Sequence, residues 1–122
     1  MQPQGHLQVV LNLIHYLFNP QHALDVPRIC ISPPDDEKDS SDPLAYSFTD
    51  VSKAVVYVED GIADEEIEKL RKMGHICKKL EDYARGMFGR GQIIQVHNDE
   101  RTGKRVLAAG SDPRADGQAG GW

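Results

Sequence analysis

The segment from residue 53 to residue 80 constrains the fold most, because it reads as strand, helix and strand in quick succession. KAVVYVE at 53–59 is rich in β-branched and aromatic residues, which favour strands. Asp64 is expected to cap a helix through Met73, and Gly74 stands where a C-cap glycine belongs. Residues 75–80 return as a strand. The pattern predicts a compact βαβ-like unit.

A strongly apolar helix is predicted at 3–18, near the start of the chain. Its stripe repeats at helical spacing and consists of Leu7, Val10, Leu11, Ile14 and Leu17. Val9, Leu13 and Phe18 widen it, which predicts a helix that is covered on more than one side. Asn19-Pro20 ends this helix, and Pro20 suits the first turn of a second short helix over 21–26.

Three further strands complete the pattern. RICIS at 28–32 is short and apolar and stops at Pro33-Pro34. Residues 91–96 and 104–109 form a hairpin around a turn-rich loop at 98–103. The chain is therefore an α+β protein with roughly five strands and three helices. Its 122 residues suffice for one domain of ordinary size.

Composition excludes several classes of function. The net charge is -5 and the acidic residues are spread along the chain, which argues against a nucleic-acid partner. No apolar run approaches the ~18 residues of a membrane span, so none is predicted. No signal peptide is visible. The sequence leaves the compartment of the parent protein unknown.

Side chains that could carry chemistry do not assemble into a complete catalytic set. Cys30 and Cys77 lie in apolar stretches and read as buried thiols, bridged only if their strands are neighbours. The acidic run at 35–37 lacks the spacing of a calcium loop. The histidines lack zinc spacing and read as surface or capping residues: His6, His15, His22, His75 and His97. Neither a metal nor a cofactor is predicted.

Two weaker motifs are also set aside. Ser111 lacks the glycine pattern of a nucleophile elbow. Gly86, Gly89 and Gly91 hint at a phosphate cradle, but their spacing fits neither known phosphate-binding fingerprint. We favour a flexible connection that lets the backbone lie close to another segment.

Two long terminal motifs carry a family resemblance. MQPQGHLQVVLNLIHYLFNPQHALDVPR at 1–28 and AAGSDPRADGQAGGW at 108–122 resemble the γ-glutamyltransferase (glutathione hydrolase) family. The strand, helix, glycine-histidine and strand order between them is similar too, as is the closing hairpin. The resemblance covers nearly the whole chain. The departures are a surface insertion at about 33–50 and Trp122, where a tyrosine is more usual.

The resemblance implies an N-terminal nucleophile hydrolase with a four-layer αββα fold, of which this chain would be part. A precursor of such an enzyme cleaves itself into large and small subunits. The new N-terminal threonine attacks the γ-glutamyl amide, for example of glutathione, with its own amino group as base. Two glycine N–H groups hold the oxyanion, and the acyl-enzyme passes γ-glutamate to water or an amino acid.

Carried over by position, the resemblance makes residues 1–122 the C-terminal portion of a small subunit. The threonine would lie well upstream of Met1 and the oxyanion glycines immediately upstream, so no residue here is catalytic and the chain alone is expected to be inactive. Gln2 and Gln4 are the candidate substrate-binding residues; alternatively they bond to the backbone at the helix start. Asp112 and Arg114, in the family's Asp-Pro-Arg, are interpreted as a structural ion pair or turn.

The partners implied are the rest of the small subunit and the large subunit, with a γ-glutamyl substrate in the complete enzyme. Uncovered faces of the helix at 3–18 and of the strands would favour self-association. Two alternatives stay open. One is a non-catalytic, truncated interaction module, and the other is an acylase or amidase of the same superfamily with a different substrate.

Overall fold

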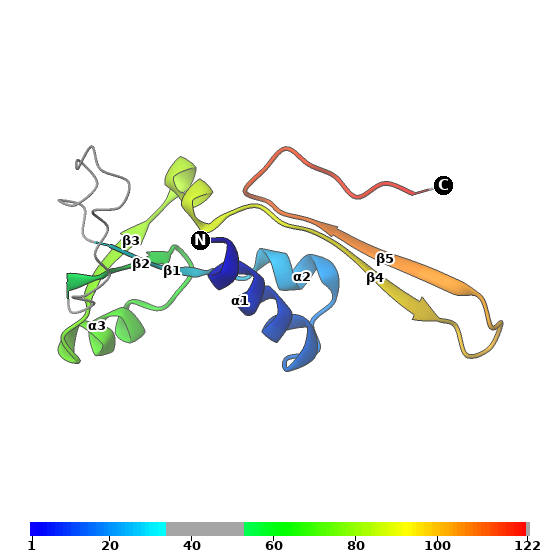
Figure 1. Ribbon diagram of the computed structural model, residues 1–122, viewed down its shortest axis with the longest axis horizontal. Helices are drawn as coiled ribbons and strands as arrows, with labels where there is room; N and C mark the ends of the chain where they lie inside the picture. Colours follow the sequence, from blue (N-terminus) through cyan, green and yellow to red (C-terminus); the bar gives the residue numbers. More distant parts are fainter. Residues whose placement is uncertain (34–52, 122) are drawn as a thin grey trace. The chain divides into compact units, whose positions relative to one another are not determined.

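The computed structural model of the chain describes residues 1–33 and 53–121 (Figure 1). Nearly all of the expected insertion at about 33–50, including the acidic run at 35–37, lies outside these residues. The described residues form two compact units. Unit 1 comprises Met1 and Pro27–Phe88, and unit 2 comprises Gln2–Val26 and Gly89–Trp122.

Unit 1 is built on a three-stranded sheet in the order β1-β2-β3. Its strands are β1 (Ile29–Ser32), β2 (Val55–Glu59) and β3 (Ile76–Leu80). β1 runs antiparallel to β2, whereas β3 runs parallel to it. Helix α3 (Asp64–Lys72) connects the parallel pair, because parallel neighbours need a crossover. The predicted βαβ-like unit is confirmed.

The central strand β2 is buried along its whole length. Successive side chains of a strand point to opposite faces, so β2 contributes to two apolar clusters. Val55 and Tyr57 pack with Cys30 and Phe88, while Val56 and Val58 pack with the residues on the other face, Ile67 and Cys77. A strand covered on both faces explains the nearly continuous apolar run in the sequence.

The two cysteines are buried free thiols, as predicted. Cys30 is in register with Tyr57 and Cys77 with Val56. Their strands flank β2 rather than each other, and the two side chains belong to the clusters on opposite faces. A bridge between them is excluded by this arrangement.

Helix α3 differs from its prediction at the first residue. The N-cap is Ala63, which makes no side-chain cap bond, so Asp64 is the first helical residue rather than the cap. Asp64 still contributes negative charge to the first turn, where the helix dipole favours it. Gly74 has φ +97°, as expected of a glycine after a helix end. The mixed segment after β3 forms a 3-10 helix, η3 (Asp82–Phe88).

Unit 2 begins with helices α1 (Gln2–Ile14) and α2 (Pro20–Asp25). The prediction of one helix as far as residue 18 was wrong, because the chain leaves helical geometry after Ile14 and Leu17 has φ +55°. The start of α2 is as predicted, with Pro20 in the first turn. Asn19 caps it by accepting the backbone N–H of His22 at 2.9 Å.

The other half of unit 2 is the hairpin of β4 (Gln92–Asn98) and β5 (Arg105–Ser111). The strands are antiparallel, with Gln92 opposite Ser111 and Asn98 opposite Arg105. α2 packs against β5 at Gly110, where a Cβ atom would come within 2.7 Å of the Gln21 nitrogen. Only glycine allows so close an approach of helix and strand.

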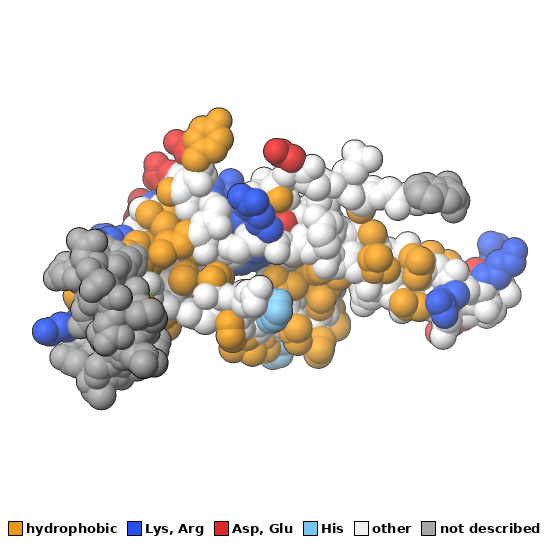
Figure 2. All heavy atoms as spheres, turned by 45° about the horizontal axis from the view of Figure 1, so that its top comes forward, with side chains coloured by type: hydrophobic (Ala, Val, Ile, Leu, Met, Phe, Trp, Pro, Cys, Tyr) orange, Lys and Arg blue, Asp and Glu red, His pale blue; other side chains and the backbone are white. Residues whose placement is uncertain are grey.

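Apolar surface is left uncovered in unit 2. No residue of α1 is buried, and Leu7, Val10, Leu11 and Ile14 are 45–71% exposed. On the hairpin, Ile94 and Leu107 are 69% and 59% exposed. Figure 2 shows how much hydrophobic surface is exposed on one face of the molecule. The prediction that the first helix is covered on more than one side was wrong for the described part of the chain, in which no residue of α1 is buried and the apolar stripe stays exposed.

Candidate functional site

The predicted substrate-binding residues Gln2 and Gln4 lie in the first turn of α1. Gln2 is exposed and Gln4 is half-buried. Backbone N–H groups in the first turn have no partner within the helix, so polar ligands and side chains gather there. The Gln8 amide donates to the Gln4 carbonyl at 3.0 Å. Both glutamines therefore lie near the start of the helix, and their role in substrate binding stays a prediction.

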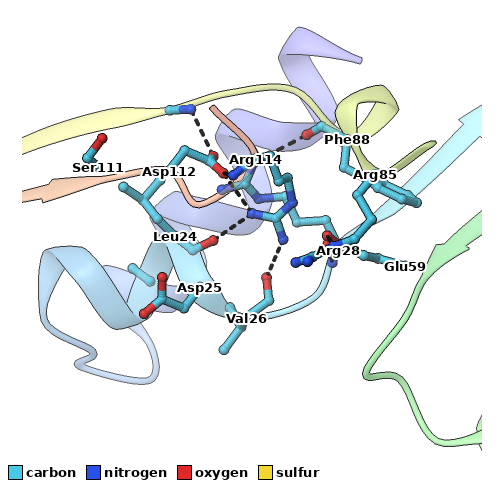
Figure 3. Close-up of polar contacts among 12 residues, drawn as sticks. Leu24, Asp25, Val26, Arg28, Glu59, Arg85, Phe88, Ser111, Asp112 and Arg114 are labelled. Atoms are coloured by element: carbon cyan, nitrogen blue, oxygen red, sulfur yellow. Dashed lines mark hydrogen bonds and ion pairs between the residues drawn. The ribbon is translucent and has the colours of Figure 1, made fainter. Parts of the chain in front are cut away.

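Asp112 and Arg114 form a fully buried ion pair, which confirms their structural interpretation (Figure 3). Arg114 Nη1 lies 3.0 Å from Asp112 Oδ1, and both side chains have 0% exposure. Arg114 also donates to the Leu24 carbonyl at 2.8 Å and the Val26 carbonyl at 3.1 Å. These carbonyls lie at the end of α2, where a cation is favourable. The guanidinium thus fastens the end of α2 to the segment that follows β5.

The Asp112 carboxylate completes this network at the start of β4. Its Oδ2 accepts the Gly91 N–H at 2.8 Å, and the Asp112 N–H donates to the Gly91 carbonyl at 3.1 Å. A Cβ atom at Gly91 would lie 2.7 Å from a methyl group of Leu24. The absence of a side chain at Gly91 therefore allows the start of β4 to lie close to α2, which agrees with the predicted close approach of the backbone to another segment. A phosphate cradle using its N–H is excluded, because an internal carboxylate already occupies that donor.

Ser111 is held by amides rather than by a base. Its hydroxyl oxygen accepts from Gln92 Nε2 at 2.8 Å. The Gln21 side chain accepts the Ser111 N–H at 3.0 Å and donates to its carbonyl at 2.9 Å. An amide cannot remove a hydroxyl proton, so this contact does not activate the serine as a nucleophile.

A second buried ionic cluster lies in unit 1 and was missed by the sequence analysis (Figure 3). Glu59 ends β2 with 0% exposure. Its carboxylate accepts the Arg28 N–H at 2.8 Å and Arg85 Nε at 2.7 Å. Arg28 is itself 3% exposed and donates to the Phe88 carbonyl at 3.3 Å. The cluster ties β1, β2 and η3 together, and a carboxylate directly after the run VVYV was the only local signal.

Three charged groups outside these clusters have shifted pKa values. The hydrogen bond from Lys79, reinforced by the Gly61 N–H, lowers the pKa of Asp60. Its partners Asp60 and Asp64, 3.1 and 3.3 Å away, raise the pKa of Lys79. At the hairpin loop, the Thr102 hydroxyl and then the Arg101 N–H lower the pKa of Asp99. All three groups are at the surface, where such pairs stabilise little.

The described residues contain no group of three or more His, Cys, Asp or Glu side chains that could hold a metal ion. His22 instead packs edge-on against Phe18, with ring centroids 4.2 Å apart, and His15 packs against Tyr16 at 4.9 Å. No helix within 1–33 or 53–121 is long and apolar enough to cross a membrane.

Comparison with known proteins decides the family. The whole chain, residues 1–122, matches the family described as gamma-glutamyltranspeptidase. The chain belongs to the γ-glutamyltranspeptidase family. It is 28% identical over 120 residues to the glutathione hydrolase-like YwrD proenzyme of Bacillus subtilis, a match that covers 98% of the chain and 19% of that protein.

Solved structures of this family's relatives show the same fold. A cephalosporin acylase from Bacillus halodurans superposes with a TM-score of 0.70 and 36% identity over 98% of the chain and 18% of the acylase. The T380A mutant of Helicobacter pylori γ-glutamyltranspeptidase superposes with a TM-score of 0.64 and 23% identity, and the match covers 92% of the chain and 47% of that protein. The predicted α+β class and its relation to the N-terminal nucleophile hydrolases are confirmed. The γ-glutamyltranspeptidase-like chain thus spans less than a fifth of the first two relatives.

Proposed function

We propose that residues 1–122 are the C-terminal portion of the small subunit of a γ-glutamyltranspeptidase-like enzyme. The complete enzyme would cleave γ-glutamyl amides such as glutathione through an N-terminal threonine. The observation that carries the proposal is the family match over the whole chain, combined with the 19% and 18% of the two relatives named first that the chain covers. The chain supplies a structural part of the active enzyme, and by itself it is inactive.

The buried ion pair supports a structural rather than a catalytic role for this chain. Asp112 and Arg114 bind each other, and Arg114 also donates to backbone carbonyls at the end of α2. These residues therefore position structural elements and take no part in the reaction. The start of α1 would then be the part of this chain nearest the chemistry in sequence, because the resemblance puts the oxyanion glycines immediately upstream of Met1. Gln2 and Gln4 would approach the γ-glutamyl group there with amide donors and acceptors.

The test is an assay of a polypeptide extended through the coding sequence upstream of Met1. We expect a γ-glutamyl anilide to release its aniline, and a new N-terminal threonine to appear on sequencing. The absence of aniline release from a folded, self-cleaved protein would contradict the proposal. Replacing Gln4→Ala in this extended form should raise KM more than it lowers kcat. The exposed Gln118→Ala is the matched control and should leave both constants unchanged.

A second candidate function is an acylase acting on a different amide. It is favoured by the 36% identity to the cephalosporin acylase, against 28% to the glutathione hydrolase-like protein. The same extended polypeptide, given a cephalosporin amide and a γ-glutamyl anilide in parallel, separates the two by their kcat/KM ratio. If the native protein instead begins at Met1 and is a stable monomer, the enzyme-fragment proposal fails for this chain and a non-catalytic interaction module is favoured.

A further inference from the structure

Helix α1 presents its apolar stripe away from the rest of unit 2. Leu7, Val10, Leu11 and Ile14 follow the spacing i, i+3, i+4 and i+7 and are 61%, 46%, 45% and 71% exposed. The half-covered side of the helix carries the polar residues Gln4, Gln8 and Asn12. A surface helix of a globular protein normally has the opposite orientation, with its apolar side facing the core.

The inward side of α1 already has partners. Asn12 Nδ2 donates to the Ala23 carbonyl of α2 at 3.2 Å. Val9 and Leu13 are half-buried on this side. Rotating α1 to bury the apolar stripe would break the bond to Ala23 and expose Val9 and Leu13. The contacts of Asn12, Val9 and Leu13 therefore fix the orientation of α1 and leave the apolar stripe exposed.

The composition of α1 shows that its outer side is not adapted to water. No Asp, Glu, Lys or Arg occurs before Asp25, although charged residues make up 27% of the chain. By contrast, α3 carries acidic residues in its first turn and basic residues in its last. Helices that lie on anionic membranes need Lys and Arg beside the apolar face, and α1 has neither. A protein surface is the partner that an uncharged, apolar helix face fits.

The length of the relatives identifies that partner. The chain accounts for only 19% of the Bacillus subtilis relative and 18% of the Bacillus halodurans acylase, and it matches each of them over 98% of its own length. We propose that the stripe Leu7, Val10, Leu11 and Ile14 docks an apolar face of the remainder of the parent enzyme. This inference rests on the proposed function. Residues three and four apart form the ridges by which helices interlock, so a helix or a flat sheet face lined by aliphatic side chains fits the stripe.

The test uses two polypeptides, namely this chain and the one encoded immediately upstream of Met1 in the same reading frame. Their affinity is measured for the unaltered chain, for the double variant Leu7→Gln/Leu11→Gln and for Met73→Gln. Met73, at the end of α3, is 74% exposed and provides the matched control for placing Gln at an exposed apolar site. We expect the double variant to bind about 100-fold more weakly, about tenfold for each leucine, and the control to bind within about twofold of the original.

A second measurement needs no variant. Hydrogen exchange of the unaltered chain should slow over residues 6–15 when the upstream polypeptide is added. Unchanged affinity of the double variant, or unchanged exchange over 6–15 in a complex that forms, would overturn the inference. So would the absence of any complex, or a dimer of this chain that the double variant abolishes, since the partner would then be a second copy.

Activity separates this inference from the proposed function. A complex that depends on the stripe but releases no aniline from a γ-glutamyl anilide refutes the proposed function and keeps the docking surface. A complex that hydrolyses the anilide and tolerates both glutamines refutes the docking surface alone. Because the substituted leucines are exposed, far-ultraviolet circular dichroism of the free chain should be unchanged by the double substitution.

Discussion

The two units of this chain bury their side chains in opposite ways. Unit 1 encloses β2 on both faces and turns the charged side of α3 to solvent. Unit 2 has only Ala23 and Leu24 among the buried hydrophobic residues of the described chain, and its first helix exposes an uncharged apolar stripe. A surface that carries charge is adapted to water, and one that does not is adapted to contact. The contrast indicates that unit 1 is the more self-sufficient and that unit 2 is built to be covered.

Unit 2 relies on polar contacts in place of an apolar core. The buried pair of Asp112 and Arg114 connects α2, the start of β4 and the end of β5 through hydrogen bonds to backbone groups. A buried ion pair adds little net stability compared with apolar residues of similar size, but losing one partner leaves the other charge unsatisfied. Unit 2 should therefore be sensitive at this pair and tolerant on its exposed apolar faces.

Removing the guanidinium should have the largest effect. Arg114→Met removes the guanidinium that lies 3.0 Å from the buried Asp112 carboxylate and that donates to the carbonyls of Leu24 and Val26. We expect the free energy of unfolding to fall by about 3–5 kcal/mol in urea titrations. Exchange protection should be lost in β4 and β5 first. The exposed Arg90→Met is the control, and a loss below about 1 kcal/mol for Arg114→Met would contradict this role.

The same substitution in the two units should give unequal results. Ile67 of α3 is 2% exposed, whereas Ile94 of β4 is 69% exposed. Ile67→Ala should destabilise the chain by about 2–5 kcal/mol, because it removes buried methylenes and leaves a cavity. Ile94→Ala should stay within about 0.5 kcal/mol in the free chain. Equal losses in thermal or urea unfolding would show that unit 2 buries Ile94 after all.

Two glycine substitutions test how tightly α2 lies on β5. A Cβ atom at Gly110 would lie 2.7 Å from the backbone of Pro20 and Gln21. A Cβ atom at Gly86 would have no neighbouring atom within 4 Å. Gly110→Ala should therefore destabilise the chain by about 1–3 kcal/mol, since backbone must move. Gly86→Ala should be neutral within about 0.5 kcal/mol, as surface substitutions usually are. If calorimetry finds the two variants indistinguishable, the helix and strand are not in close contact.

The smallest effect concerns the exposed charges of unit 1. The pKa of Asp60 is lowered in the folded chain. The Asp60 carboxylate therefore stabilises the fold at pH values above its ordinary pKa near 3.8, and this stabilisation disappears as pH falls through the folded pKa. The pKa of Lys79 is raised, so its contribution is present below about 10.5 and disappears as pH rises through the folded pKa. Lys79→Met should move the Asp60 midpoint upward in carboxyl NMR titrations. Lys69→Met, which removes the exposed pair with Glu66, should not.

Local signals predicted the elements well. The apolar run of β2, the glycine after α3 and the Asn-Pro start of α2 each act within a few residues, so the sequence shows them directly. The exposure of α1 could not be predicted, because periodicity tells which side chains share a face and not what covers that face.

The buried ionic clusters were also beyond local patterns. Glu59 meets Arg28 and Arg85 across separations of 31 and 26 residues, and Arg114 reaches Leu24 over 90 residues. The predicted helix began at residue 3, so the sequence placed Gln4 in the first turn, and the structure adds Gln2 as the first helical residue.

The most direct test is a reconstitution assay with a γ-glutamyl anilide. Aniline release is measured for the 122-residue chain, for the polypeptide encoded upstream of Met1, and for the two together. If this chain is a structural part of a γ-glutamyltranspeptidase-like enzyme, only the mixture releases aniline, and Leu7→Gln/Leu11→Gln reduces the release by weakening assembly. Turnover by the 122-residue chain alone, or a stable mixture without turnover, would contradict that conclusion.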